Sequence, residues 1–236
     1  MTKVFAINGS ARMEKGYTHK VLTAFLEGME AQNATVETVF AKRLKIRPCL
    51  GDFQCWFEKV GECIQTDDMD SLLPKLREAD ILVLGIPIYF PFPGEVQNLL
   101  NRLMPLVEPI LEFQDGRTRA KFHDDVKISK IVLVSAGGWW EKENMTLLVQ
   151  FVEHMAQDAN VEFSGAVLRP HAFIMDEYKE KGEEVLAALR SAGAQLVREG
   201  KMSSATLETI SRPLIDEKVL RERYNEMYRR AKESSS

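Results

Sequence analysis

Cysteine and histidine are scarce in this chain, whose 236 residues include three cysteines and four histidines. An odd number of cysteines leaves one without a partner, so the sequence does not predict a complete disulfide framework. The histidines are spread along the chain, and none lies near the cysteines in sequence. These absences argue against a disulfide-stabilised scaffold and against a structural zinc site built from cysteine and histidine.

Long apolar runs and blocks of like charge are also absent. The longest apolar stretch, ILVLGIPIYFPFPG (81–94), is too short to cross a bilayer and is interrupted by prolines. The first residues, MTKVFAINGS, lack the apolar core and cleavage site of a signal peptide. The formal net charge is −4, which favours neither nucleic acid nor an anionic membrane as a partner. We therefore expect a cytoplasmic protein that acts on small molecules.

What the chain does contain is a regular alternation of strand and helix patterns. The strand-like segments are KVFAING (3–9), TVETVFA (35–41), DILVLGI (80–86), KISKIVLVSAGG (127–138) and VEFSGAVLRP (161–170). Helical patterns, with apolar residues three and four apart, lie between and after them. This order predicts an α/β fold, with helices on both faces of a five-stranded parallel sheet.

The same alternation suggests how the chain is divided. Residues 1–200 are predicted to form the α/β domain. Residues 201–236 are predicted to form a helical extension, packed on the domain or on a partner subunit, and the segment FQDGRTRAKFHDD (113–125) is predicted to be a polar loop. The last ten residues equally suit a solvated, frayed terminus.

In an open parallel sheet, ligands bind beyond the carboxyl ends of the strands. The loop NGSARMEKGYTHK (8–20) follows the first strand and combines hydroxyls of Ser10 and Thr18, the charge of Arg12 and the amino end of a helix. These groups suit a phosphate. Its glycines fit neither G-x-G-x-x-G nor the P-loop pattern. The alternative is a polar turn that only caps the helix.

Two further strand-end loops are predicted to meet the first. PIYFPFPGEV (87–96) is aromatic and stiffened by prolines, which suits a flat ring. SAGGWWEKENM (135–145) has two glycines that let backbone approach a ligand, followed by two tryptophans. The alternatives are aromatic residues of the core or of an interface, and a glycine turn with one buried tryptophan. Together the three loops indicate a phosphorylated planar cofactor such as FMN.

With the cysteine segment CLGDFQCWFEKVGEC (49–63), these loops resemble the NAD(P)H-dependent, FMN-binding oxidoreductases. The resemblance implies a flavodoxin-like three-layer sandwich and hydride transfer from NAD(P)H through the flavin to a quinone, a nitro or azo compound, or a similar acceptor. It implies no catalytic side chain, and it implies a homodimer or homotetramer. Alternatives are a flavodoxin-like electron carrier, an iron–sulfur flavoprotein, or a flavin-free binding protein on the same scaffold.

The resemblance also implies roles for single residues. Ser10, Arg12, Tyr17 and Thr18 would hold the FMN phosphate, Pro87, Ile88, Tyr89 and Phe90 would line the isoalloxazine ring, and Ala136, Gly137, Gly138 and Trp139 would close its other edge. Two positions depart from the family pattern. Tyr17 replaces a small residue, and Asn101 precedes Arg102 where an Asp-Arg pair is more usual.

Some relatives, the iron–sulfur flavoproteins, hold a cluster with four close cysteines. This chain has Cys49, Cys55 and Cys63, and Asp52 stands where the second cysteine would be. A carboxylate is a poor substitute for a thiolate in such a cluster. We therefore predict no metal and a structural loop near the flavin, with buried thiols and with Phe53, Trp56 and Phe57 buried beside them.

Overall fold

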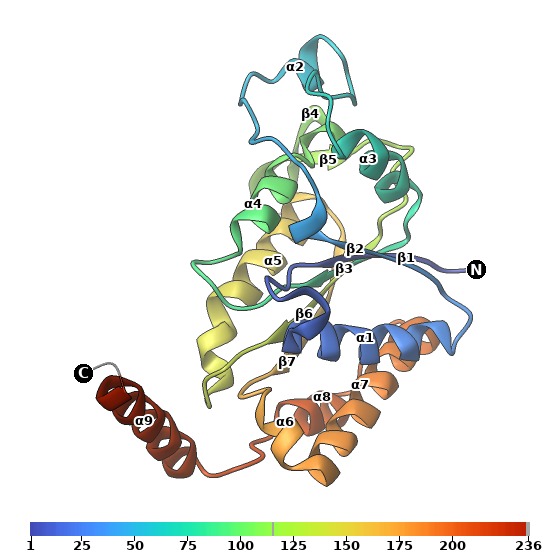
Figure 1. Ribbon diagram of the computed structural model, residues 1–236. Helices are drawn as coiled ribbons and strands as arrows, with labels where there is room; N and C mark the ends of the chain where they lie inside the picture. Colours follow the sequence, from blue (N-terminus) through green and yellow to red (C-terminus); the bar gives the residue numbers. More distant parts are fainter. Residues whose placement is uncertain (115, 235–236) are drawn as a thin grey trace.

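The computed structural model describes residues 1–114 and 116–234 (Figure 1). The strands are β1 (Lys3–Asn8), β2 (Thr35–Phe40), β3 (Ile81–Gly85), β4 (Val107–Gln114), β5 (Arg117–Phe122), β6 (Lys130–Ala136) and β7 (Glu162–Arg169). The helices are α1 (Tyr17–Glu30), α2 (Gln54–Phe57), α3 (Met69–Glu78), α4 (Gly94–Asn101), α5 (Thr146–Asp158), α6 (Ile174–Glu177), α7 (Lys179–Glu199), α8 (Ser204–Ser211) and α9 (Glu217–Ser234).

The main sheet has the strand order β2-β1-β3-β6-β7, and each neighbouring pair is parallel. In the centre, Ile7 of β1 is level with Val39 of β2 and Leu84 of β3. This is the flavodoxin-like order, in which the chain starts near the middle and winds outward in both directions. The predicted fold class, a three-layer sandwich with a helical extension, is confirmed.

The central strands β1, β3 and β6 are apolar on both faces because helices cover both. Val4 and Ala6 of β1 belong to the core cluster that contains α1 and α7, whereas Phe5 and Ile7 belong to the cluster that contains α3, α4 and α5. Burial of one such side chain stabilises the fold by about 1.5–3 kcal/mol. The alternation along β1 thus fixes which helices lie on which side of the sheet (Figure 1).

Two glycines let α1 and α7 pack closely under the sheet. A Cβ on Gly28 would lie 1.9 Å from the carbonyl oxygen of Arg190, and a Cβ on Gly193 would lie 2.0 Å from that of Phe25. Backbone therefore meets backbone at this crossing. The close contact fixes the carboxyl half of α1 against α7.

The prediction of a polar loop over residues 113–125 is wrong. β4 and β5 form an antiparallel hairpin outside the main sheet. The sequence RTRAKF of β5 is polar because one face of this small sheet is open to solvent. β5 pairs with β4 through backbone hydrogen bonds, which polar residues make as well as apolar ones. Ile110, Leu111 and Phe113 of β4 are exposed.

The predicted C-terminal extension is helical. Ser203 caps the start of α8, because its hydroxyl accepts a hydrogen bond from the backbone N–H of Thr206 at 3.2 Å. α8 packs on α7 and β7. A connector leads to α9, which lies at the margin of the molecule (Figure 1). Where the first domain ends remains a prediction.

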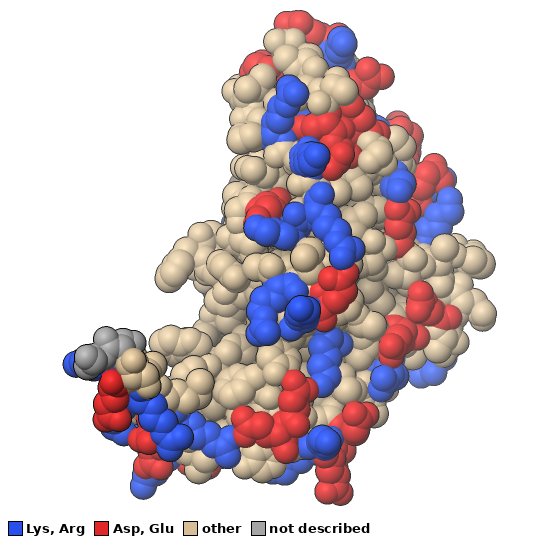
Figure 2. Space-filling view, in the orientation of Figure 1, with Lys and Arg blue, Asp and Glu red and all other residues tan. Residues whose placement is uncertain are grey.

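The surface carries mixed charge. Figure 2 shows basic and acidic side chains interspersed over one face, in keeping with a net charge of −4. Among the described residues, no helix is both long enough and apolar enough to cross a membrane.

Candidate cofactor site

A cavity of about 400 Å³ lies at the carboxyl edge of the main sheet. Since β1, β3 and β6 are adjacent and parallel, the loops that follow them meet at this edge. The cavity is lined by Ser10, Ala11, Arg12, Gly16, Tyr17, Thr18, Pro87, Tyr89, Ala136, Gly137, Gly138, Phe173, Tyr224 and Met227. The structure therefore brings together nine of the twelve residues that the sequence singled out.

The loop after β1 is fixed by its own hydrogen bonds. The side chain of Asn8 accepts a bond from the N–H of Ser10 at 3.0 Å, and the N–H of Gly9 donates to Gly85 of β3 at 2.7 Å. Gly16 is the N-cap of α1 and has no side chain to accept the N–H groups of the first turn. These groups and the positive end of the helix dipole are left for an anion.

Tyr17 lines the cavity with its ring, but its hydroxyl is already engaged. It donates to Asp176 of α6 at 2.7 Å, and Lys20 pairs with the same carboxylate at 2.5 Å. Burial, then the bond to Asp176, raises the pKa of Tyr17 to about 12. The tyrosine thus joins α1 to α6 and stays neutral, which leaves Ser10, Arg12 and Thr18 as the side chains that can meet a phosphate.

Three predicted residues lie outside the lining: Ile88, Phe90 and Trp139. Ile88 packs behind the glycine turn, where a Cβ on Gly137 would lie 2.9 Å from its Cδ1. Phe90 is fully exposed and Trp139 is 72% exposed. Sequence alone could not distinguish these two side chains from lining residues, because both follow a lining residue directly.

Phe173, Tyr224 and Met227 were not predicted as site residues. Phe173 precedes α6, and the other two lie on α9. The only signal was the spacing of Leu220, Tyr224 and Met227, which places them on one face of a helix in an otherwise charged tail. Burial raises the pKa of Tyr224, so it also remains a neutral phenol.

The cavity fits a phosphorylated planar cofactor. A Cβ on Gly16 would lie 2.0 Å from the Ser10 hydroxyl, and a Cβ on Gly137 would lie 2.8 Å from Met145. A methyl group at either glycine would therefore displace the end of a neighbouring side chain. An uncapped helix end at one side and apolar walls at the other match a phosphate and an aromatic ring system.

The cysteine segment forms a separate lobe that stands out from the sheet around α2 (Figure 1). Cys49, Cys55 and Cys63 line one cavity of about 390 Å³. Cys49 is exposed, and so are Phe53 and Phe57. The prediction of buried thiols beside buried aromatic residues is therefore wrong in part, because a lobe outside the three layers has little core to pack against.

The other two cysteines are partly buried. Burial, followed by the proximity of Cys63 and Cys49, raises the pKa of the Cys55 thiol. Over residues 1–114 and 116–234, no group of three or more Cys, His, Asp or Glu side chains has the arrangement to hold a metal ion.

A buried ion pair fastens the lobe to the domain. Arg102, just after α4, donates to Asp67 at 2.7 Å and to the carbonyl of Arg47 at 2.8 Å. The two side chains are 1% and 5% exposed. Asp67 also accepts the N–H of Met69, the first residue of α3, at 3.0 Å. Although Asn101 stands where an aspartate is more usual, the arginine that follows it makes a structural contact with Asp67.

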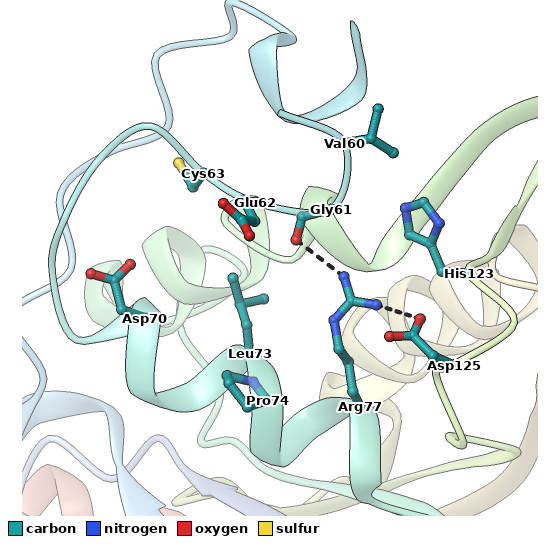
Figure 3. A pocket seen from close by; sticks show the side chains of 10 residues that line it. All are labelled: Val60, Gly61, Glu62, Cys63, Asp70, Leu73, Pro74, Arg77, His123 and Asp125. Carbon is teal, nitrogen blue, oxygen red and sulfur yellow. Dashed lines mark hydrogen bonds and ion pairs between the residues drawn. The ribbon is translucent and has the colours of Figure 1, made fainter. Parts of the chain in front are cut away.

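A larger cavity of about 620 Å³ lies between this lobe, α3 and the end of β5 (Figure 3). Arg77 projects into it, but its guanidinium donates to Asp125 at 2.5 Å and to the carbonyls of Gly61 and Pro105. None of the predicted site residues lines this cavity. It is therefore distinct from the candidate cofactor site.

The fold and the edge cavity define a class: a flavodoxin-like protein with a site for a phosphorylated planar cofactor. The model of the family described as NADPH-dependent FMN reductase matches residues 2–122, about half of the chain. The chain belongs to this family, and it is an FMN-binding flavoprotein.

Known relatives agree with this assignment. An iron–sulfur flavoprotein of Methanocaldococcus jannaschii is 33% identical over 108 residues, which are 46% of this chain and 53% of that protein. The match thus spans about half the length of the curated relatives.

Two solved structures share the fold. An FMN-dependent NADH-azoreductase from Bacillus anthracis, in complex with FMN, is 15% identical with a TM-score of 0.59, and the match covers 84% of this chain and 100% of that one. An NAD(P)H:quinone oxidoreductase from Methanothermobacter marburgensis is 16% identical with a TM-score of 0.56, and covers 83% and 94%.

Proposed function

We propose that this chain is an NAD(P)H-dependent flavin oxidoreductase that passes electrons to a small organic acceptor such as a quinone or a nitro or azo compound. The observation that supports this most is the single cavity that unites the uncapped start of α1 with the Pro87–Tyr89 and Ala136–Gly138 loops. Membership of the NADPH-dependent FMN reductase family indicates that the cofactor is FMN.

The residues of the chain would bind and orient the cofactor rather than react. Ser10, Arg12, Thr18 and the first N–H groups of α1 would hold the phosphate. Pro87 and Tyr89 would support one side of the ring, and the backbone of Gly137 and Gly138 would approach its edge. Bound in this way, FMN would supply the hydride chemistry that links NAD(P)H to the electron acceptor. No side-chain acid or base is required, so we assign no catalytic residue.

We further propose a homodimer or homotetramer. Phe90 and Trp139 each follow a lining residue and are exposed in the single chain. Exposed aromatic side chains beside a site are typical of a surface that a partner or substrate covers. A second subunit at this position would complete the mouth of the cavity.

The visible spectrum of protein purified without air, with metal analysis, tests the proposal first. We expect a flavin spectrum, FMN close to one per chain after reconstitution, and NAD(P)H oxidation that requires an added quinone or azo dye. FMN binding without steady-state NAD(P)H oxidation would identify an electron carrier instead. Protein that cannot bind FMN would refute the proposal.

An iron–sulfur flavoprotein remains the second candidate, because all three cysteines line one cavity and relatives carry that name. A broad visible absorbance with stoichiometric iron in the same preparation would favour it. Iron below one tenth of the chain concentration would favour a flavoprotein without a cluster. The two candidate functions share the FMN site and differ in whether the protein contains iron.

A further inference from the structure

The cofactor cavity has one wall that the strand-end loops do not supply. Tyr224 and Met227 of α9 line the cavity together with Phe173. α9 lies outside the residues that the family model matches. The family model therefore does not include this wall of the cavity.

Tyr224 is held directly against the glycine turn. Its hydroxyl donates to the carbonyl oxygen of Gly138 at 3.3 Å, and a Cβ on Gly138 would lie 3.2 Å from that hydroxyl. On the other side, its ring meets Phe173 edge to face, with ring centroids 5.8 Å apart. The ring is thus placed between two other lining residues.

The first turns of α9 are docked on the domain. Leu220 is buried. Arg223 forms an ion pair with Glu177 and donates to the hydroxyl of Tyr178 at 3.3 Å. Both residues precede Tyr224 on α9, and their contacts fix the first turns of the helix so that Tyr224 lies against the cavity.

The connector before α9 is fixed by side chains at the end of β7. Arg169 is buried and donates to the carbonyls of Ile210 at 2.7 Å and Arg212 at 3.1 Å. His171 is also buried, and its Nε2 accepts the N–H of Leu214 at 3.1 Å. Burial, then the nearby Arg169 charge, lowers the pKa of His171 to about 4, so this nitrogen is free to accept. The connector is consequently a defined part of the fold.

A tryptophan and a lysine complete this anchor. Trp140 donates from its indole nitrogen to the carbonyl of Ile215 at 2.9 Å, and Lys181 donates to that of Leu214 at 2.9 Å. Trp140 lies two residues after Gly138, in the loop that follows β6. The same loop that approaches the cofactor therefore also holds the connector of α9.

We propose that α9 is a wall of the flavin site and that Tyr224 is a residue that positions and retains FMN. This inference rests on the proposed function. Met227 lines the cavity but is 65% exposed, and a planar aromatic ligand would cover this apolar side chain.

Titration of the apoprotein with FMN, followed by quenching of flavin fluorescence, tests the inference. Tyr224→Ala is expected to raise the Kd for FMN roughly 3- to 10-fold, the size of one aromatic contact. Tyr228→Ala is the matched control, because Tyr228 lies one turn further on α9, is 69% exposed and does not line the cavity. Tyr224→Phe keeps the ring and is expected to recover most of the affinity.

Tryptic digestion gives a second readout that does not depend on activity. α9 contains Arg229 and Arg230, so we expect FMN to slow cleavage there in the wild type and in Tyr228→Ala but not in Tyr224→Ala. The digestion of the wild type needs no variant, so it remains informative if Tyr224→Ala does not fold.

The outcomes separate this inference from the proposed function. Wild type that binds FMN, with equal Kd values for Tyr224→Ala and Tyr228→Ala, would overturn the role of Tyr224 and leave the proposed function intact. If FMN binds to the wild type but leaves tryptic cleavage of α9 unchanged, the proposal that α9 forms a wall of the flavin site is wrong. Wild type that binds no FMN would overturn both proposals together.

Discussion

At the scale of single residues, three glycines in the loops around the cofactor cavity have no room for a side chain. A Cβ would meet Val96 at 2.7 Å from Gly9, Ser10 at 2.0 Å from Gly16, and Met145 at 2.8 Å from Gly137. Each contact lies below the separation that side chains tolerate. Gly16 and Gly137 line the cavity, and at all three positions a side chain would displace its neighbours.

Gly16→Ala tests this at the phosphate end. The new methyl group would turn the Ser10 hydroxyl away from the cavity, so FMN binding is expected to weaken by about 0.5–1.5 kcal/mol, the value of one hydrogen bond. The free energy of unfolding should change by no more than about 1 kcal/mol. Isothermal titration with FMN measures the first quantity and urea unfolding the second.

The control is Gly94→Ala, which has no atom within 4 Å of the added Cβ. It is expected to bind FMN like the wild type. If Gly16→Ala also binds FMN with unchanged affinity, Ser10 does not contact the phosphate.

At the scale of elements, the Asp67–Arg102 pair joins the cysteine lobe, α3 and α4. Burial tends to raise the pKa of Asp67, but hydrogen bonds from Arg102 and from the N–H groups of Arg47 and Met69 outweigh it and lower the pKa below its usual value. The stabilisation by this carboxylate is therefore complete above about pH 4 and is lost as the pH falls through the lowered pKa.

Asp67→Asn is expected to reduce the free energy of unfolding at pH 7 by about 3–5 kcal/mol, because it leaves the buried Arg102 charge without its partner. Urea unfolding at pH 7 and at pH 3 measures this, and the gap to the wild type should narrow at pH 3. Asp124→Asn, at a 93% exposed side chain, should cost less than about 1 kcal/mol. A gap independent of pH would mean that the charge of Asp67 does not contribute.

The elements also show how far the sequence could be interpreted alone. β3 and β6 were predictable because they are apolar on both faces, and the loops with Ser10 and Gly137 followed from the rule that sites lie at strand ends. β5 was missed because its charged residues pair outside the core. Tyr224 was missed because the covered face of α9 depends on where the anchored connector leads, and no local pattern contains that information.

At the scale of the whole molecule, many large apolar side chains face solvent in the single chain. They include Phe57, Phe90, Phe113, Trp139 and Leu147. Isolated apolar residues on a surface are ordinary, but exposed apolar side chains on several separate segments are typical of a protein that associates. On the face drawn in Figure 2 the charged residues are of mixed sign, so this face does not oppose close approach of two copies.

Size-exclusion chromatography with light scattering is expected to give at least twice the mass of one chain. Replacing both Phe90 and Trp139 with serine should shift the population toward monomer, because it removes the apolar surface at the mouth of the cavity. Phe113→Ser, on the hairpin, serves as a comparison. A wild type that remains monomeric across a concentration series would contradict the proposed dimer.

The cavity draws its walls from segments that appear successively during synthesis. Ser10 emerges first, then Pro87, then Gly137, and Tyr224 only after the whole sheet has been translated. Since chains are made at about 5–20 residues per second and fold from the N-terminus, the sheet is available seconds before the site is closed. If α9 is a wall of the site, an FMN molecule that reached the nascent chain in this interval would find the pocket open on the side of α9.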